Sequence, residues 1–271
     1  IDGTFLLNQA TFIHGLHRKY CNGVQSPKSL PYSKLITKLG KLDPKCKEVL
    51  ECREEYQAII GACHFLANVT RPDICFTVST LGQYGEYAGK KHLSMSHDLL
   101  QYLNASADLS IRLGGSGTSG SDEISTILRR NDLELRQDDI NTLSDAATAE
   151  RQMGGHINYR DISPIAWHGA GLRFTCISIC DAEHAEAVRA VGSAIWIAGI
   201  CKDLGMRPDR VPKLLCDNTA VLFLSQGNKS SKNSRHMLRR IQYLREMVEQ
   251  MKIRIEHIPS ACNIADIFTK P

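Results

Sequence analysis

The stretch Lys213-Leu214-Leu215-Cys216-Asp217-Asn218 is a short apolar run that stops at a carboxylate. A run of this length predicts a buried strand that ends at Asp217. The preceding segment, Asp181–Leu204, has small apolar residues on one helical face and predicts a long helix. A basic helix, Ser234–Met251, and a strand, Lys252–Ile258, are expected to follow. This alternation of strands and helices predicts a layered α/β sheet.

Further strands are expected before the long helix. The predicted strands are Ile140–Ala147, Gly155–Tyr159, Pro164–His168 and Leu172–Ile179, some of them joined by glycine-containing turns. Asn263 is placed to cap a last short helix. The second half of the chain is thus expected to form an α/β sheet of three or four antiparallel strands followed by a helix, a strand, a helix and a strand.

The first half of the chain has a different pattern. Apolar residues recur at intervals of three and four over Glu54–Asn68, Asp73–Tyr87 and Lys91–Ala105, after a strand-like start at Thr4–Leu7. A glycine- and serine-rich stretch, residues 114–121, separates the two halves. We therefore predict a mainly helical region over residues 1–113, a linker over 114–137 and an α/β domain over 138–271.

Composition excludes several classes of protein. The chain has 271 residues, of which 42% are hydrophobic and 23% charged, with a formal net charge of +4. The apolar content is sufficient for a core, and no apolar run approaches the roughly 20 residues of a membrane-spanning helix. The ten cysteines are scattered, which favours free thiols in a reducing compartment. Because the chain begins at Ile1 and ends at Pro271, we expect it to be a piece of a longer translation product.

Four carboxylates occupy the strand ends and helix starts of the predicted sheet. Asp145 lies in the first strand, Glu183 at the start of the long helix, Asp217 after the buried strand and Asp266 at the start of the last helix. Gathered at one edge, they would repel one another unless divalent cations neutralised them. Oxygen ligands favour Mg²⁺ or Mn²⁺, and two such ions can activate a water and stabilise a leaving oxygen. The alternative for each acid is an exposed carboxylate or a helix cap.

Basic residues gather in a tract without acids from Asn218 to Arg245. Its cationic residues include Lys229, Lys232, Arg235, Arg239 and Arg240, with His236 among them. Such a tract is typical either of a solvated face or of a surface that meets a phosphate backbone.

The acidic motifs resemble those of a known family. Ser144-Asp145-Ala146, Asp181-Ala182-Glu183-His184, Cys216-Asp217-Asn218 and the ending Ala265–Pro271 resemble, in order, the motifs of the RNase H domain of copia-type LTR retrotransposon Pol polyproteins. The helical half resembles the end of the same family's reverse transcriptase, the thumb or connection region, on Tyr56–Gly61 and Thr70-Arg71-Pro72-Asp73-Ile74.

This resemblance implies an RNase H-like fold, which is a mixed five-stranded sheet with flanking helices. It also implies an endonuclease that hydrolyses the RNA strand of RNA–DNA hybrids with two Mg²⁺ or Mn²⁺ ions. It implies that Asp145, Glu183, Asp217 and Asp266 bind the metal, with Glu183 preferred to Asp181. His236 matches a family histidine that would assist proton transfer or product release; the alternative is a histidine on a helix face. The basic residues Lys229, Lys232, Arg235, Arg239 and Arg240 would hold the hybrid backbone.

The resemblance also implies a cellular context. The partners would be the RNA–DNA hybrid and the upstream reverse transcriptase and integrase parts of the polyprotein, with no membrane. The setting would be intracellular, in a cytoplasmic particle and/or the nucleus.

Polymerase activity is not expected, because the only Asp-Asp pair, Asp138-Asp139, lies in polar surroundings and not on an apolar hairpin.

Departures from the family pattern keep a second function open. Ser144-Asp145-Ala146-Ala147-Thr148 lacks the second acid and the aromatic residue of the family motif, and Met153-Gly154-Gly155 replaces a Thr-Ser-Gly turn. The alternative to a nuclease is a catalytically dead nucleic-acid-binding or interaction module derived from the element. A zinc site at Cys176, Cys180 and His184, or a cysteine hydrolase using Cys180 and His184, is weaker because further ligands or an orienting acid are missing.

Overall fold

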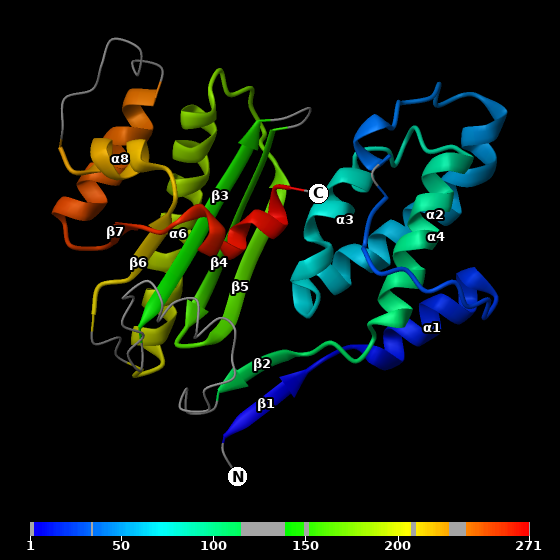
Figure 1. The fold of residues 1–271 in the computed structure, drawn as a ribbon, viewed down its shortest axis with the longest axis horizontal. Coiled ribbons are helices and arrows are strands. Elements are labelled where there is room, and N and C mark those ends of the chain that lie inside the picture. The colour runs from blue at the N-terminus through cyan, green and yellow to red at the C-terminus, as the bar shows by residue number, and fades with distance from the viewer. Residues whose placement is uncertain are drawn as a thin grey trace. The chain divides into compact units, whose positions relative to one another are not determined.

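The computed structural model describes residues 3–33, 35–114, 139–148, 152–206, 210–227 and 237–270. Contacts divide the chain into two units. One unit comprises Arg112–Lys270 together with Ile1–Phe5, and the other comprises Leu6–Ile111. Figure 1 shows the chain coloured from the N-terminus to the C-terminus. The proposed linker, residues 114–137, lies outside the described residues except for Gly114. Among the described helices, none is both long enough and apolar enough to cross a membrane.

The unit that contains most of the second half is built on a five-stranded sheet. Its strands are β3 (Ile140–Thr148), β4 (Gln152–Arg160), β5 (Ser163–Gly171), β6 (Lys213–Cys216) and β7 (Arg254–His257). The strand order is β5-β4-β3-β6-β7. β4 is antiparallel to β3 and β5, whereas β6 is parallel to β3 and β7. This mixed sheet, with helices beside it, confirms the predicted RNase H-like fold class.

One predicted strand is wrong. Residues 172–178 are irregular, and the sheet ends at β5. The side chain of Gln152 explains why: its Oε1 accepts from the Cys176 backbone N–H at 2.7 Å, and its Nε2 donates to the Cys176 carbonyl at 2.6 Å. A side-chain amide therefore satisfies the backbone groups that a strand partner would have bonded.

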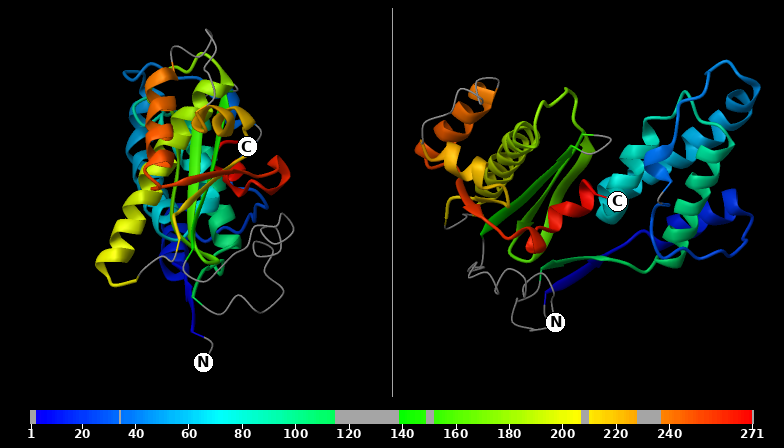
Figure 2. Two further views of the ribbon diagram at one scale, coloured as in Figure 1. Left: turned by 90° about the vertical axis from the view of Figure 1, so that its left-hand side faces the viewer. Right: turned by 45° about the horizontal axis from the view of Figure 1, so that its top comes forward.

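Two adjacent glycines of β4 define the two faces of the sheet. A Cβ on Gly154 would lie 2.3 Å from Glu186 Oε2 of α6 (Ile179–Asp203), and one on Gly155 would lie 2.2 Å from Phe268 Cβ of η5 (Ile264–Phe268). Because neighbouring residues of a strand point to opposite faces, α6 and η5 cover opposite faces of the sheet. Figure 2 shows this in its left view, with the helices α6 and α8 on one side and the C-terminal segment on the other.

Alanines let α6 approach the sheet closely. Its buried face joins a core with the two further helices α7 (Thr219–Ser225) and α8 (Leu238–Glu249). The core residues are Ala187, Ala190, Val191, Ala194, Leu214, Cys216, Val221, Leu244, Ile253 and Ile255. The apolar run from which the fold was predicted, now strand β6, thus lies against α6, as a buried inner strand should.

The other unit is mainly helical, as predicted. It contains α1 (Ala10–Cys21), η1 (Ile36–Lys38), α2 (Lys47–Val69), η2 (Pro72–Ile74), α3 (Cys75–Gly82) and α4 (Lys90–Ala105). Helix α1 was not predicted, and α3 ends at Gly82 rather than Tyr87. The strands β1 (Thr4–Leu7) and β2 (Ile111–Gly114) form a separate two-stranded sheet.

The Thr70–Ile74 motif has a structural role in the helical unit. Arg71 is only 1% exposed, and its guanidinium donates to both carboxylate oxygens of Asp73, at 2.9 and 2.7 Å. It also donates to the carbonyl and hydroxyl oxygens of Ser106, while the Tyr102 hydroxyl donates to Asp73. This bidentate pair fixes the turn between α2 and α3 against the end of α4.

Candidate metal centre

Asp145 lies on β3, the central strand, and is 2% exposed. The Thr269 hydroxyl donates to its Oδ2, and Lys270 Nζ lies 3.8 Å from the same oxygen. Burial raises the pKa of Asp145, although the Thr269 bond and the charge of Lys270 act in the opposite direction. The carboxyl is therefore held by residues from the C-terminal segment on the η5 face of the sheet.

Glu183 is the fifth residue of α6 and points to the same place. The helix starts where Ser178, as N-cap, accepts from the Asp181 backbone N–H at 3.1 Å. Burial, followed by the charges of Asp145 and Asp217, raises the pKa of Glu183 to about 8. Its Oε2 is buried and has no hydrogen-bond partner among the described residues. A buried carboxylate oxygen without a partner is unfavourable, so it favours a cation nearby.

Asp217 follows the last residue of β6 and completes the group. The Asn263 amide donates to the Ser144 carbonyl at 2.9 Å and to Asp217 Oδ1 at 3.4 Å. The Asn263 side chain also caps η5, as predicted, by accepting from the Ala265 backbone N–H. One residue therefore links β3, the end of β6 and the start of η5.

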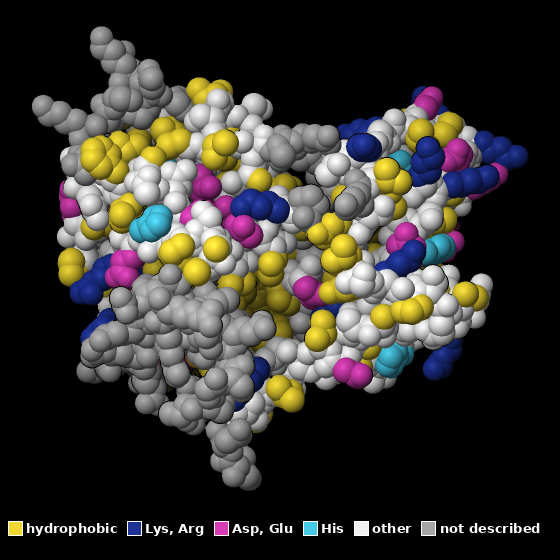
Figure 3. All heavy atoms as spheres, viewed as in Figure 1, with side chains coloured by type: hydrophobic (Ala, Val, Ile, Leu, Met, Phe, Trp, Pro, Cys, Tyr) yellow, Lys and Arg dark blue, Asp and Glu magenta, His cyan; other side chains and the backbone are white. Residues whose placement is uncertain are grey.

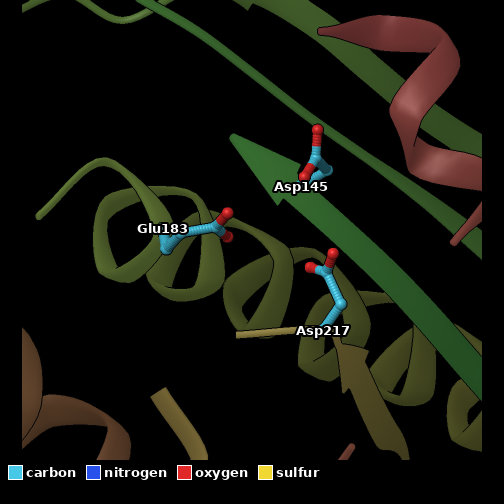
Figure 4. A group of neighbouring side chains, drawn as sticks. All are labelled: Asp145, Glu183 and Asp217. Carbon is cyan, nitrogen blue, oxygen red and sulfur yellow. The ribbon is translucent and has the colours of Figure 1, made fainter. Parts of the chain in front are cut away.

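The three carboxylates converge, as Figure 4 shows. Asp145, Glu183 and Asp217 each offer an oxygen, and these ligand atoms all lie within 4.8 Å of one another. They come from a strand, a helix and a strand end, so they are positioned by the sheet core and not by a mobile loop. Three oxygen donors, one of them buried without a partner, fit a hard divalent cation such as Mg²⁺ or Mn²⁺.

Asp266 lies beside this group without belonging to it. Its Oδ2 is 2.8 Å from Lys270 Nζ, and its Oδ1 is buried and unpartnered among the described residues. Lys270 therefore bridges Asp266 and Asp145. Figure 3 shows acidic and basic side chains next to one another where Figure 1 places η5. The sequence identified the four acids but gave no indication of this lysine's position.

A second buried polar group lies on the α6 face. Glu186 is fully buried; its Oε1 is 2.6 Å from His156 Nδ1 and its Oε2 is 3.2 Å from the Arg189 guanidinium. Arg189 also contacts His168, and both border a hollow of about 340 Å³ with Arg173. No motif in the sequence marked this network, although Gly154 leaves the space that Glu186 occupies.

Only part of the predicted basic surface can be described. Lys229, Lys232, Arg235 and His236 lie outside the described residues. Arg239 is exposed, whereas Arg240 pairs with Asp181 and stacks 4.3 Å from the Phe174 ring centroid. Arg240 therefore joins α8 to the start of α6.

The structure places Cys180 Sγ 3.6 Å from His184 Nδ1 but does not activate the thiol, so the weaker alternatives stay incomplete. His184 is fully buried and its Nδ1 lies 2.8 Å from the Cys180 carbonyl, while burial raises the pKa of the Cys180 thiol. A thiol that stays protonated is a poor nucleophile. Cys176 lies in the irregular segment before α6 and is not on the helix face that a zinc site would need.

With this geometry, the chain can be compared with known proteins. No family model matches the chain. It is 26% identical to the retrovirus-related Pol polyprotein from transposon RE1 of Arabidopsis thaliana over 80% of its length. It is 23% identical to that from transposon TNT 1-94 of Nicotiana tabacum over 97% of its length.

Its homologues are Pol polyproteins of copia-type retrotransposons. This confirms the resemblance found in the motifs. The chain spans 14% of the RE1 polyprotein and 19% of the TNT 1-94 polyprotein. A similar region of a Ty1 Gag-Pol polyprotein of Saccharomyces cerevisiae is 20% identical over 83% of the chain.

Solved structures give a weaker likeness. An N-terminal RNase H domain from Mycobacterium tuberculosis matches 48% of this chain and 90% of that chain, at 14% identity and a TM-score of 0.39. A foamy viral protease–reverse transcriptase in complex with an RNA/DNA hybrid matches 97% of this chain and 28% of that chain, at 13% identity and a TM-score of 0.43. The fold assignment rests on the strand order given above and not on these scores.

Proposed function

We propose that residues 138–271 form a ribonuclease H that hydrolyses the RNA strand of RNA–DNA hybrids with Mg²⁺ or Mn²⁺. The observation that carries this proposal is the convergence of Asp145, Glu183 and Asp217, with ligand oxygens within 4.8 Å of one another. The homology to Pol polyproteins supports a nucleic acid as the substrate, since their names associate them with transposons.

The proposed chemistry is hydrolysis of a phosphodiester at the carboxylate group. Bound ions would activate a water and stabilise the leaving oxygen. Asp145, Glu183 and Asp217 would hold the ions through their carboxylate oxygens. Thr269 and Asn263 would orient Asp145 and Asp217 through their hydrogen bonds. Glu183 must lose its proton to act as a ligand, and so ion binding should strengthen as the pH rises toward 8.

From the same homology we propose roles for the rest of the chain and for its partners. Residues 1–113 would be the C-terminal, thumb- or connection-like part of a reverse transcriptase, and 114–137 a linker. We infer that the chain does not polymerise DNA by itself, because its Asp138-Asp139 pair follows the helical part in the sequence and lies among polar residues. Further proposed partners are the upstream reverse transcriptase and integrase, and the setting would be a cytoplasmic particle and/or the nucleus. Arg239 and the residues Lys229, Lys232, Arg235 and His236 remain candidates for contact with the hybrid.

The test is cleavage of an RNA–DNA hybrid labelled on one strand at a time. The full chain should cut only the RNA strand, in Mg²⁺ or Mn²⁺, and lose this activity in the Asp217→Asn variant. Asp203→Asn, a matched change at an exposed position of α6, should leave cleavage unchanged. A folded wild-type chain that binds the hybrid without cleaving it in either ion would favour the catalytically dead module.

A further inference from the structure

Lys270 lies where a second cation would share Asp145 with Asp266. Its Nζ is 2.8 Å from Asp266 Oδ2 and 3.8 Å from Asp145 Oδ2. The first group, Asp145, Glu183 and Asp217, does not include Asp266. Two neighbouring positions for positive charge therefore exist around Asp145, and the chain's own ammonium group holds one of them.

The position of Lys270 is set by the fold. It lies four residues after Asp266, and its backbone N–H donates to the Asp266 carbonyl at 3.1 Å. Phe268, fully buried over Gly155, anchors the segment to the sheet. Burial lowers the pKa of Lys270, but the bond to Asp266 and the charges of Asp145 and Asp217 outweigh it and raise the pKa above its ordinary value. Lys270 is thus a resident, charged partner of the acids.

The same geometry leaves room for an exchange. The Lys270 side chain is 50% exposed, so its ammonium can leave toward solvent. Asp266 Oδ1 is buried without a partner among the described residues, so the lysine satisfies only one of the two Asp266 oxygens. A divalent ion carries twice the charge of the lysine, and the carboxylates of Asp266 and Asp145 could both bind it.

We propose that Lys270 is an internal counter-cation that occupies the second cation position, between Asp145 and Asp266, and that a second divalent ion must displace it. This inference rests on the proposed metal site. The first ion would bind at Asp145, Glu183 and Asp217 without displacing any residue. The second would bind more weakly, because it competes with a positive charge that is covalently part of the chain.

The test is a calorimetric titration of the full chain with Mn²⁺, compared with Lys270→Met. We expect a tight and a weak site in the wild type. In the variant the second site should strengthen by at least about thirtyfold, the change expected on removing one unit charge about 4 Å from a divalent ion even in water. Without metal, Lys270→Met should unfold at a lower temperature, because Asp145 and Asp266 lose their shared counter-charge. Lys252→Met, at an exposed lysine, should match the wild type in both measurements.

The outcomes separate this inference from the proposed function. Asp266→Asn should remove the second site and leave the first. If Lys270→Met and the wild type give the same isotherm with Mn²⁺ bound in both, the inference is wrong while the metal site stands. If neither protein binds Mn²⁺, the proposed function itself fails. Second-site binding that appears only in Lys270→Met would support the exchange most strongly.

Discussion

Glu183→Gln tests the electrostatics of the carboxylate group. Glu183 is 5% exposed, and burial with the charges of Asp145 and Asp217 raises its pKa to about 8. In the unfolded chain the value is about 4.3. The folded, metal-free protein therefore keeps a proton that the unfolded chain releases, and its stability falls as the pH rises from about 4.3 to about 8.

The size of this effect follows from the shift. At about 1.4 kcal/mol for each pH unit, Glu183 alone lowers the free energy of unfolding by at most about 5 kcal/mol at pH 8 relative to pH 4. Glutamine stays neutral, so Glu183→Gln should be more stable than the wild type at pH 8 and similar at pH 5. A smaller slope should remain in the variant, since burial also raises the pKa of Asp145.

The assay is urea unfolding with a chelator present, at intervals from pH 5 to pH 8. The matched control is Glu249→Gln, at an exposed position of α8, which should follow the wild-type slope. Added Mn²⁺ should reverse the order at pH 8, because the wild type gains ion binding and the variant lacks a ligand. A wild-type stability that is flat or rises over this range, with Glu183→Gln parallel to it, would refute the reasoning.

Two further substitutions test the packing that supports the site and the other unit. Gly155→Ala would place a Cβ 2.2 Å from Phe268 Cβ, so we expect a loss of about 1–3 kcal/mol in urea unfolding and weaker Mn²⁺ binding as η5 moves away. Gly171→Ala, whose Cβ would lie 3.8 Å from its nearest neighbour, is the control, and equal stability of the two variants would contradict the proposed packing. Arg71→Met should destabilise by about 3 kcal/mol, because Asp73 loses its buried partner. Mn²⁺ binding by a folded Arg71→Met chain should not change. A stability loss no larger than that of Arg53→Met, at a partly exposed arginine, would show that the buried pair is unimportant.

Sequence patterns predicted the sheet well where apolar periodicity was strong. The run at residues 213–216 is a buried strand, and the long helix differs from its prediction mainly by starting two residues earlier, at Ile179. The error at residues 172–179 arose because a β-like pattern cannot reveal that Gln152 bonds the Cys176 backbone from another strand. That interaction depends on tertiary packing.

The candidate site was predictable in composition but not in arrangement. The acids could be selected because each followed or began an element, and the structure brings Asp145, Glu183 and Asp217 together. Lys270 was visible as a residue of the final motif, but a single cationic residue near the end of a chain predicts no contact. Its ion pairs depend on Phe268 docking over Gly155, which no local pattern encodes.

The most direct test of the account is the position of Mn²⁺ in crystals of the full chain, located by its anomalous scattering. We predict a peak bonded to oxygens of Asp145, Glu183 and Asp217, and its loss in Asp217→Asn. At high Mn²⁺ a second peak should lie between Asp145 and Asp266. Crystals soaked at pH 8 that show no peak at the three carboxylates would contradict the central claim that this group binds a divalent ion.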